Sequence, residues 1–216
     1  MNSAFAVLAL VAALGVCASA QAAGDPAAGK EKAAPCAGCH GPDGNSGVPN
    51  FPKLAGQHES YLLKQLKEFK SGVRKNQIMS GQVAGLSEQD MADLAAFYAE
   101  QSVQHGKADP DLVDEGQKLY RGGNPASNVS ACSACHGPTG AGNPAAKFPV
   151  LAGQHAEYTV AQLKAFREAG HVDKATFEPE TAPGRGNDPG RMMQNIAVTM
   201  SDDEIEAVAS YVQGLR

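Results

Sequence analysis

The sequence predicts an all-α protein made of two tandem copies of one small domain. Phe51–His58 recurs almost unchanged as Phe148–His155, at an offset of 97 residues. Self-similarity at this distance is typical of a duplicated domain. Apolar residues recur at the helical spacing, and no stretch shows the alternation of a strand. The 24 glycines and 13 prolines among 216 residues indicate loops between the helices.

Residues 1–22 are interpreted as a signal peptide. The stretch from Ala4 to Ala20 is almost entirely apolar, but it is too short for an ordinary membrane-spanning helix. Small residues then offer a cleavage site after Ala22. Cys17 would suggest a lipoprotein, but Val16 occupies a position that needs a small residue. Because no second long apolar run follows, we expect a periplasmic mature protein without a membrane span.

The mature chain is expected to form one domain over 23–104 and another over 105–216. The polar stretch from Val103 to Pro110 is the expected linker. Beyond the shared segment the repeat offset grows from 97 to 114, so the second copy carries 17 additional residues, roughly 171–187. A long inserted loop usually decorates a surface or serves a function. We therefore expect this insertion to cover the surface or to shape a docking face.

Three amphipathic helices can be placed from the sequence. The first carries Leu62, Leu66 and Phe69 on one face. Ser87 is expected to cap the second, and Ser201–Glu204 has the pattern of a capping box for the third. Domains with so few helices bury a modest core, which an internal cofactor would complete. The core residues expected in the last two helices are Met91, Leu94, Ala95, Tyr98, Ile205, Val208, Ala209 and Val212.

A Cys-x-x-Cys-His motif occurs once in each copy. On one helical turn the two thiols and the imidazole project from the same side. Two thiols at this spacing can add to the two vinyl groups of a haem, and the imidazole can then reach the iron. The motif is typical of c-type haem attachment, so we expect two covalently bound haem c groups. The residues are Cys36, Cys39 and His40 in the first copy, and Cys132, Cys135 and His136 in the second.

Paired cysteines also occur in redox disulfides, zinc sites and structural disulfides. A redox disulfide of the thioredoxin type would need a parallel sheet, which the sequence does not predict. A four-cysteine zinc site would have to combine both copies and would leave the following histidines unexplained. Two structural disulfides remain an alternative in an exported protein.

The sixth position of each iron is expected to be filled by methionine, as in many low-spin electron carriers. The repeat register selects Met79 and Met193, because each lies eight residues before the serine that caps the last helix of its copy. We expect both in loops before that helix. Met192 is the rival of Met193, whereas Met91 and Met200 are expected to pack in the core.

Together these features resemble class I cytochrome c in two tandem copies. The whole mature chain, with Phe-Pro-x-Leu-Ala-Gly-Gln after each haem motif, is similar to the dihaem cytochromes c4. The resemblance implies two all-α haem domains related by a pseudo-twofold axis, and periplasmic electron transfer. It also implies that the carbonyls of Pro52 and Pro149 accept hydrogen bonds from His40 and His136, which would orient each imidazole.

We expect a single-electron carrier rather than an enzyme. Two protein ligands per iron leave no position for a substrate, and no clustered carboxylates or paired nucleophile accompany the motifs. The expected partners are a donor cytochrome or dehydrogenase and a terminal oxidase, with peripheral membrane association left open. Two alternatives are the electron-accepting subunit of a dehydrogenase, such as a flavoprotein sulfide dehydrogenase, and a dihaem peroxidase with one open iron.

The charges argue against a nucleic-acid partner and indicate a candidate site for an acidic one. The formal net charge is −5, whereas nucleic-acid binders usually carry a basic excess, so no nucleic-acid partner is expected. A local basic stretch is interpreted as a solvated helix face or a docking patch for an acidic partner. His58 and His155 match across the repeat and are expected to be exposed or to cap a helix. The basic stretch comprises Lys64, Lys67, Lys70, Arg74 and Lys75.

Overall fold

The computed structural model describes residues 23–216. The signal peptide predicted for residues 1–22, with its cleavage site and Cys17, lies outside the described residues. Within residues 23–216 the chain forms α-helices, one short 3-10 turn and no β-strand, so the predicted all-α class is confirmed. No helix of this part of the chain is both long and apolar enough to cross a membrane.

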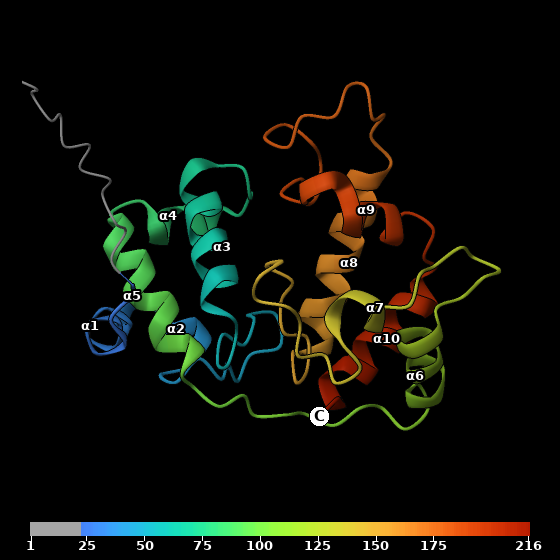
Figure 1. The fold of residues 1–216 in the computed structure, drawn as a ribbon, viewed down its shortest axis with the longest axis horizontal. Coiled ribbons are helices and arrows are strands. Elements are labelled where there is room, and N and C mark those ends of the chain that lie inside the picture. The colour runs from blue at the N-terminus through green and yellow to red at the C-terminus, as the bar shows by residue number, and fades with distance from the viewer. Residues whose placement is uncertain (1–22) are drawn as a thin grey trace, which may run out of the picture.

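The helices fall into two lobes (Figure 1). The first lobe contains α1 (Pro26–Lys32), α2 (Ala34–His40), α3 (Glu59–Ser71), α4 (Gln77–Val83) and α5 (Glu88–Ala99). The second contains α6 (Val113–Gly122), α7 (Ser133–His136), α8 (Ala156–Gly170), the 3-10 turn η1 (Pro189–Arg191), α9 (Met192–Ala197) and α10 (Asp202–Gly214).

The last helix of each lobe begins where the sequence predicts. Ser87 and Asp90 form a complete capping box at the start of α5, and Ser201 and Glu204 form one at the start of α10. These boxes satisfy backbone N–H groups that a helix start leaves without partners. All eight predicted core residues of these helices, Met91 among them, are buried, and so is Met200. The local patterns therefore located both the ends and the buried faces of α5 and α10.

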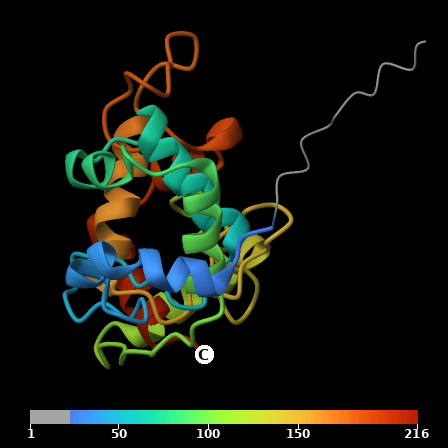
Figure 2. The same cartoon turned by 90° about the vertical axis from the view of Figure 1, so that its left-hand side faces the viewer.

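The first and last helices of each lobe cross at a glycine. Figure 2, turned so that the first lobe faces the viewer, shows α1 lying across α5. A Cβ atom on Gly29 of α1 would lie 2.0 Å from the Asp93 carbonyl oxygen, and one on Gly116 of α6 would lie 2.1 Å from that of Ala207. Only glycine allows the two backbones to approach so closely. The same crossing thus supports the core of both copies.

Substitution of Gly116 by alanine is expected to destabilise the second lobe by about 1–3 kcal/mol, because the added methyl group forces α6 away from α10. Gly122 lies at the end of the same helix, and a Cβ there would meet no atom within 4 Å. Chemical unfolding of both variants measures the difference. Gly122→Ala should be neutral or stabilising, and equal destabilisation by the two substitutions would contradict the crossing argument.

A segment without helix, residues 102–109, joins the lobes and runs along one side of both (Figure 1). It is bound along its length. Gln104 N–H donates to the Asn45 side chain at 2.7 Å in the first lobe. Gly106 N–H donates to the Gln213 carbonyl at 3.1 Å, and Asp109 N–H donates to the Ser210 hydroxyl at 2.8 Å.

Contacts between the lobes are reciprocal. His58 donates through Nε2 to the Ala141 carbonyl at 2.7 Å, and its repeat counterpart His155 donates to the Ser46 carbonyl at 2.8 Å. Reciprocal contacts of this kind are the mark of a twofold relation, so the pseudo-twofold arrangement is confirmed. The expectation that these histidines are exposed or capping was wrong. Both are half-buried, and neither side chain caps its helix.

The insertion of the second copy packs against the first lobe. Lys75 donates through Nζ to the Ala182 carbonyl at 2.8 Å, and the Asn187 side-chain amide donates to Glu68 at 2.7 Å. Residues 171–187 therefore do not simply decorate the surface, as one expectation had it. They extend the contact between the lobes.

Two residues of this insertion have counterparts in the first copy. Arg74-x-Asn76 recurs as Arg185-x-Asn187, at an offset of 111 residues. Arg74 donates to the side chains of Tyr158 and Gln162 at 2.9 Å each. Arg185 donates to Tyr61 at 2.9 Å and to Gln65 at 3.3 Å. These two residues are the repeat counterparts of the two that Arg74 contacts. The reciprocal contact survives the insertion because the added length lies on both sides of Arg185-x-Asn187.

Candidate functional site

The first Cys-x-x-Cys-His motif ends α2, and the second comprises Cys132, which is the N-cap residue, and the four residues of α7. A glycine with positive φ follows each histidine, Gly41 at 79° and Gly137 at 75°, and ends the helix there. All four cysteines of the two motifs are free. Residues 23–216 also contain no group of three or more His, Cys, Asp or Glu side chains that could hold a metal ion. The structure therefore lends no support to the disulfide and zinc alternatives.

The first cysteine of each motif packs against the core of its lobe. Cys36 lies against the buried cluster that contains Leu62 and Leu94, and Cys132 lies against the cluster that contains Leu163 and Ile205. Burial raises the pKa of the Cys36 thiol and raises that of Cys132 to about 11. Both groups are therefore neutral thiols at pH 7, held at an apolar wall.

Each histidine of the motifs is buried and held in one tautomer. His40 is 6% exposed and donates from Nδ1 to the Pro52 carbonyl at 2.8 Å. His136 is 5% exposed and donates from Nδ1 to the Pro149 carbonyl at 3.0 Å. These hydrogen bonds leave the lone pair on Nε2, which makes no hydrogen bond within residues 23–216. Burial also lowers the pKa of both imidazoles, so both are neutral metal-ligand donors.

The phenylalanine before each proline completes the support of the histidine. The Phe51 ring lies 6.3 Å from the His40 ring in a T-shaped contact, and the Phe148 ring lies 6.2 Å from the His136 ring. The second contact is tilted, with 46° between the ring planes. Ring contacts with these inclined geometries favour a fixed ring orientation. No role was predicted for these phenylalanines, although the Phe-Pro pair recurs in both copies and could have indicated one.

The candidate methionines lie in short helices, so the prediction that they lie in loops was wrong. Met79 is half-buried in α4, where the Asn76 side chain accepts from Met79 N–H at 3.0 Å and caps the helix. Met193 is half-buried in α9 and packs against the same buried cluster as Cys132. The rival Met192 is 42% exposed. In the second lobe, Met193 and a motif cysteine therefore border one apolar core.

The residues present fit a haem c in each lobe. Each copy contains free thiols, a buried neutral imidazole and a half-buried thioether. Cys36 packs against the apolar core of the first lobe, and Cys132 and Met193 pack against that of the second. A buried polar atom, Gln65 Nε2, has no hydrogen-bond partner among the described residues. Gln65 lies on α3 together with Leu62, which belongs to the cluster that Cys36 contacts. A further group with acceptor atoms beside α3 would pair this donor, since buried donors are normally paired.

Each charge of the basic stretch has a partner within the chain, although Lys70 and Lys75 are exposed to solvent. Arg74 is buried between the lobes. Lys64 pairs with Glu68 at 2.7 Å and Lys67 pairs with Glu88 at 2.6 Å. The remaining two lysines donate to backbone carbonyls, Lys70 to Leu86 and Lys75 to Ala182. The periodic spacing of these charges did not reveal that the chain itself supplies their partners.

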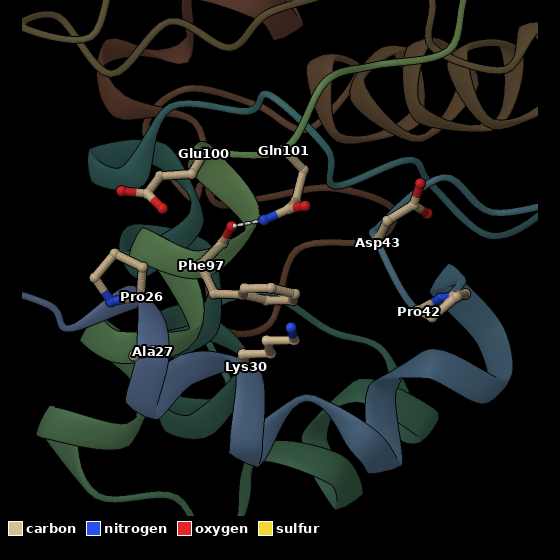
Figure 3. Close-up of a pocket in the computed structure, with 8 residues that line it drawn as sticks. All are labelled: Pro26, Ala27, Lys30, Pro42, Asp43, Phe97, Glu100 and Gln101. Atoms are coloured by element: carbon tan, nitrogen blue, oxygen red, sulfur yellow. Dashed lines mark hydrogen bonds between the residues drawn. The ribbon is translucent and has the colours of Figure 1, made fainter.

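A surface pocket lies beside the first motif, between α1, α5 and the residues that follow His40 (Figure 3). Its volume is about 490 Å³. None of its lining residues is Ser, Cys or His. The lining residues are Pro26, Ala27, Lys30, Pro42, Asp43, Phe97, Glu100 and Gln101.

Comparison with known proteins identifies the family. The cytochrome c family model matches residues 26–101 and again 113–216. The chain is 47% identical to cytochrome c4 of Azotobacter vinelandii over the full length of both proteins. The chain belongs to the cytochrome c4 family. Like other cytochromes c4, it carries two covalently bound haem c groups and is a dihaem electron-transfer protein.

Further relatives agree with this family. Cytochrome c4 of Pseudomonas aeruginosa is 48% identical over 97% of this chain and 98% of its own. The structure of reduced recombinant cytochrome c4 from Pseudomonas stutzeri is similar with a TM-score of 0.79 and 45% identity, covering 90% of this chain and all of that one. A thiosulfate dehydrogenase electron acceptor from Stutzerimonas stutzeri is 40% identical over 82% of this chain and 76% of its own. The weaker match does not favour the dehydrogenase-subunit alternative.

Proposed function

We propose that this cytochrome c4 carries single electrons in the periplasm between a respiratory donor and a terminal oxidase. One haem would reside in each of the domains 23–104 and 105–216. The observation that carries the proposal is the pair of buried, neutral imidazoles, each held by a proline carbonyl through Nδ1. This arrangement leaves Nε2 free for iron in both copies.

The proposed ligand set follows the repeat. Cys36, Cys39, Cys132 and Cys135 would form the thioethers, His40 and His136 would bind the irons, and Met79 and Met193 would bind on the opposite side. Support for Met193 over Met192 comes from burial, since Met192 is 42% exposed and Met193 packs against the core. Pro52 and Pro149 act on the iron only through the histidines that they orient.

When bound, each haem supplies a one-electron couple, and the protein adjusts its potential. The thioether of methionine raises that potential, and an apolar surrounding disfavours the additional charge of the oxidised iron. If the histidine and the methionine of each copy both bind the iron, no site is left for a substrate, and electron exchange with partners would be outer-sphere. Such encounters use small interfaces, which suits a carrier that must dock and leave quickly. A donor cytochrome or a dehydrogenase would fill the donor role.

A potentiometric titration of the purified dihaem protein, followed by its visible spectrum, tests the function. We expect two one-electron transitions at positive potential, both from low-spin haem, because methionine ligation raises the potential. A quantitative haem assay on the same sample provides the control of two haems per chain. A high-spin or low-potential component would show that Met79 or Met193 is not a ligand and would favour the peroxidase alternative.

A further inference from the structure

Two glutamines bind the backbone of the opposite domain at equivalent positions. The Gln154 side-chain amide accepts from Lys53 N–H and donates to the Lys53 carbonyl, both at 2.9 Å. The Gln57 amide makes the same two bonds to Val150, again at 2.9 Å each. Each carboxamide thus satisfies both backbone groups of one residue, as a neighbouring strand would.

The orientation of each carboxamide is fixed by the domain that carries it. Its oxygen also accepts from the next N–H in the chain, that of His58 for Gln57 and of His155 for Gln154, at 3.0 Å each. Since the oxygen receives two N–H groups while the nitrogen faces a carbonyl, a flipped amide would lose all three bonds. Gln57 is buried and Gln154 is half-buried.

In the first domain the clamped peptide is the one that holds the motif histidine. The Pro52 carbonyl, which accepts from His40 Nδ1 at 2.8 Å, belongs to the same planar peptide group as Lys53 N–H. One rigid unit therefore receives His40 at its oxygen and donates to Gln154 at its nitrogen, where the distance is 2.9 Å. Gln154 belongs to the second domain.

The second domain repeats this chain of bonds with the roles exchanged. The Pro149 carbonyl accepts from His136 Nδ1 at 3.0 Å. Val150 N–H, in the same peptide group, donates to Gln57 of the first domain at 2.9 Å. Two contiguous hydrogen-bonded routes thus cross the interface, one in each direction.

We propose that Gln154 and Gln57 are positioning residues, each setting the hydrogen bond on the axial histidine of the other domain. The inference rests on the proposed function, in which His40 and His136 bind iron. An acceptor on the peptide N–H polarises the peptide group, which makes its carbonyl a stronger acceptor. A stronger acceptor makes the imidazole a better donor to the iron, and this favours the oxidised state. Each glutamine therefore lowers the potential of the haem in the opposite domain.

The test is a pair of near-isosteric substitutions, Gln154→Met and Gln57→Met, in the full dihaem protein. For Gln154→Met we expect the potential of the first-domain haem to rise, while that of the second-domain haem stays unchanged. For Gln57→Met we expect the reverse. Proton NMR, with each haem assigned by its contacts to side chains of its own domain, reports the two potentials separately. The exchange of the Nδ1 proton should accelerate only on the histidine of the opposite domain.

Ser60→Ala is the matched control at the same interface. Ser60 donates to the Pro144 carbonyl at 2.8 Å across the interface, and it bonds to no peptide that holds a histidine. Its substitution should move neither potential. A shift on the variant's own haem, an equal shift on both, or no shift would overturn the inference. If one glutamine variant does not fold, the reciprocal variant tests the same claim. If the unsubstituted protein lacks low-spin, histidine-ligated haem, the proposed function itself has failed.

Discussion

Replacing Arg185 by methionine is expected to weaken the contact between the domains and to lower the free energy of unfolding by about 2–4 kcal/mol. The guanidinium is buried and donates to Asn187 and Gln162 at 3.0 Å, to Tyr61 at 2.9 Å and to Gln65 at 3.3 Å. Hydrogen bonds from a charged donor contribute about 1.5–3 kcal/mol each. Part of this gain is offset because the substitution also removes a charge that is costly to bury.

Because Arg185 lies between the domains, its substitution should lower the free energy of unfolding by more than the loss of its own hydrogen bonds. Arg185 also lies over the Phe166 ring, 4.4 Å from its centroid. Tyr61 of the first domain and the Asn187 side-chain oxygen of the second lose their hydrogen bond, so the substitution leaves unpaired polar groups on both sides of the interface. We therefore expect two-step unfolding for the variant and one-step unfolding for the unsubstituted protein.

Arg191→Met is the matched control for this prediction. Arg191 also lies over an aromatic ring, that of Phe177 at 4.4 Å. Its hydrogen bonds, however, go to residues of its own domain, among them the Ala169 and Val172 carbonyls. Denaturant unfolding followed separately in each domain should show that this variant weakens the second domain without uncoupling the first. Uncoupling of the same size by both variants would contradict the role assigned to Arg185.

Met193→Leu is expected to remove the methionine ligand from one of the two haems. Leucine fills a similar volume but has no sulfur, so the iron of the second domain would lose its sixth ligand and its potential would fall. Met192→Leu should leave both haems unchanged, because the Met192 side chain is 42% exposed. Visible and near-infrared absorption of the oxidised protein, which reports sulfur ligation to ferric haem, distinguishes the two variants.

The counterpart Met79→Leu completes this test. It should change the first-domain haem and leave the second intact, since Met79 lies at the equivalent distance from the capping serine of its copy. If instead Met192→Leu abolishes sulfur ligation in the second domain, the assignment from the repeat register is wrong there. Retention of sulfur ligation in all three variants would exclude all three methionines as ligands.

Features that depend on short stretches of chain could be predicted from the sequence. The capping boxes at Ser87 and Ser201 require only the residues of one helical turn, and the structure contains both. The two haem motifs also lie within single turns. The repeat also allowed a more distant contact to be predicted, because it marked Pro52 and Pro149 as equivalent positions. The carbonyl of each accepts a hydrogen bond from the motif histidine of its own domain.

Features that depend on contacts between the two copies could not be predicted. Arg74 carries the same charge as the neighbouring lysines, and only the approach of α8 shows that it is buried against Tyr158 and Gln162. The burial of His58 and His155 likewise depends on hydrogen bonds to carbonyls that lie 83 and 109 residues away in the sequence. The short helices at Met79 and Met193 were missed because their few residues carry little periodic signal.

The segment that joins the domains has a consequence for the internal electron step. Residues 102–109 bind to both lobes, through Asn45 on one side and Gln213 and Ser210 on the other. The second domain is therefore not a tethered body that samples many orientations before it meets the first. Solvent viscosity slows a diffusive search, so we expect it to have little effect on the rate of electron transfer between the two haems. The donor and acceptor must be found by collision, but the step between them is one of fixed distance.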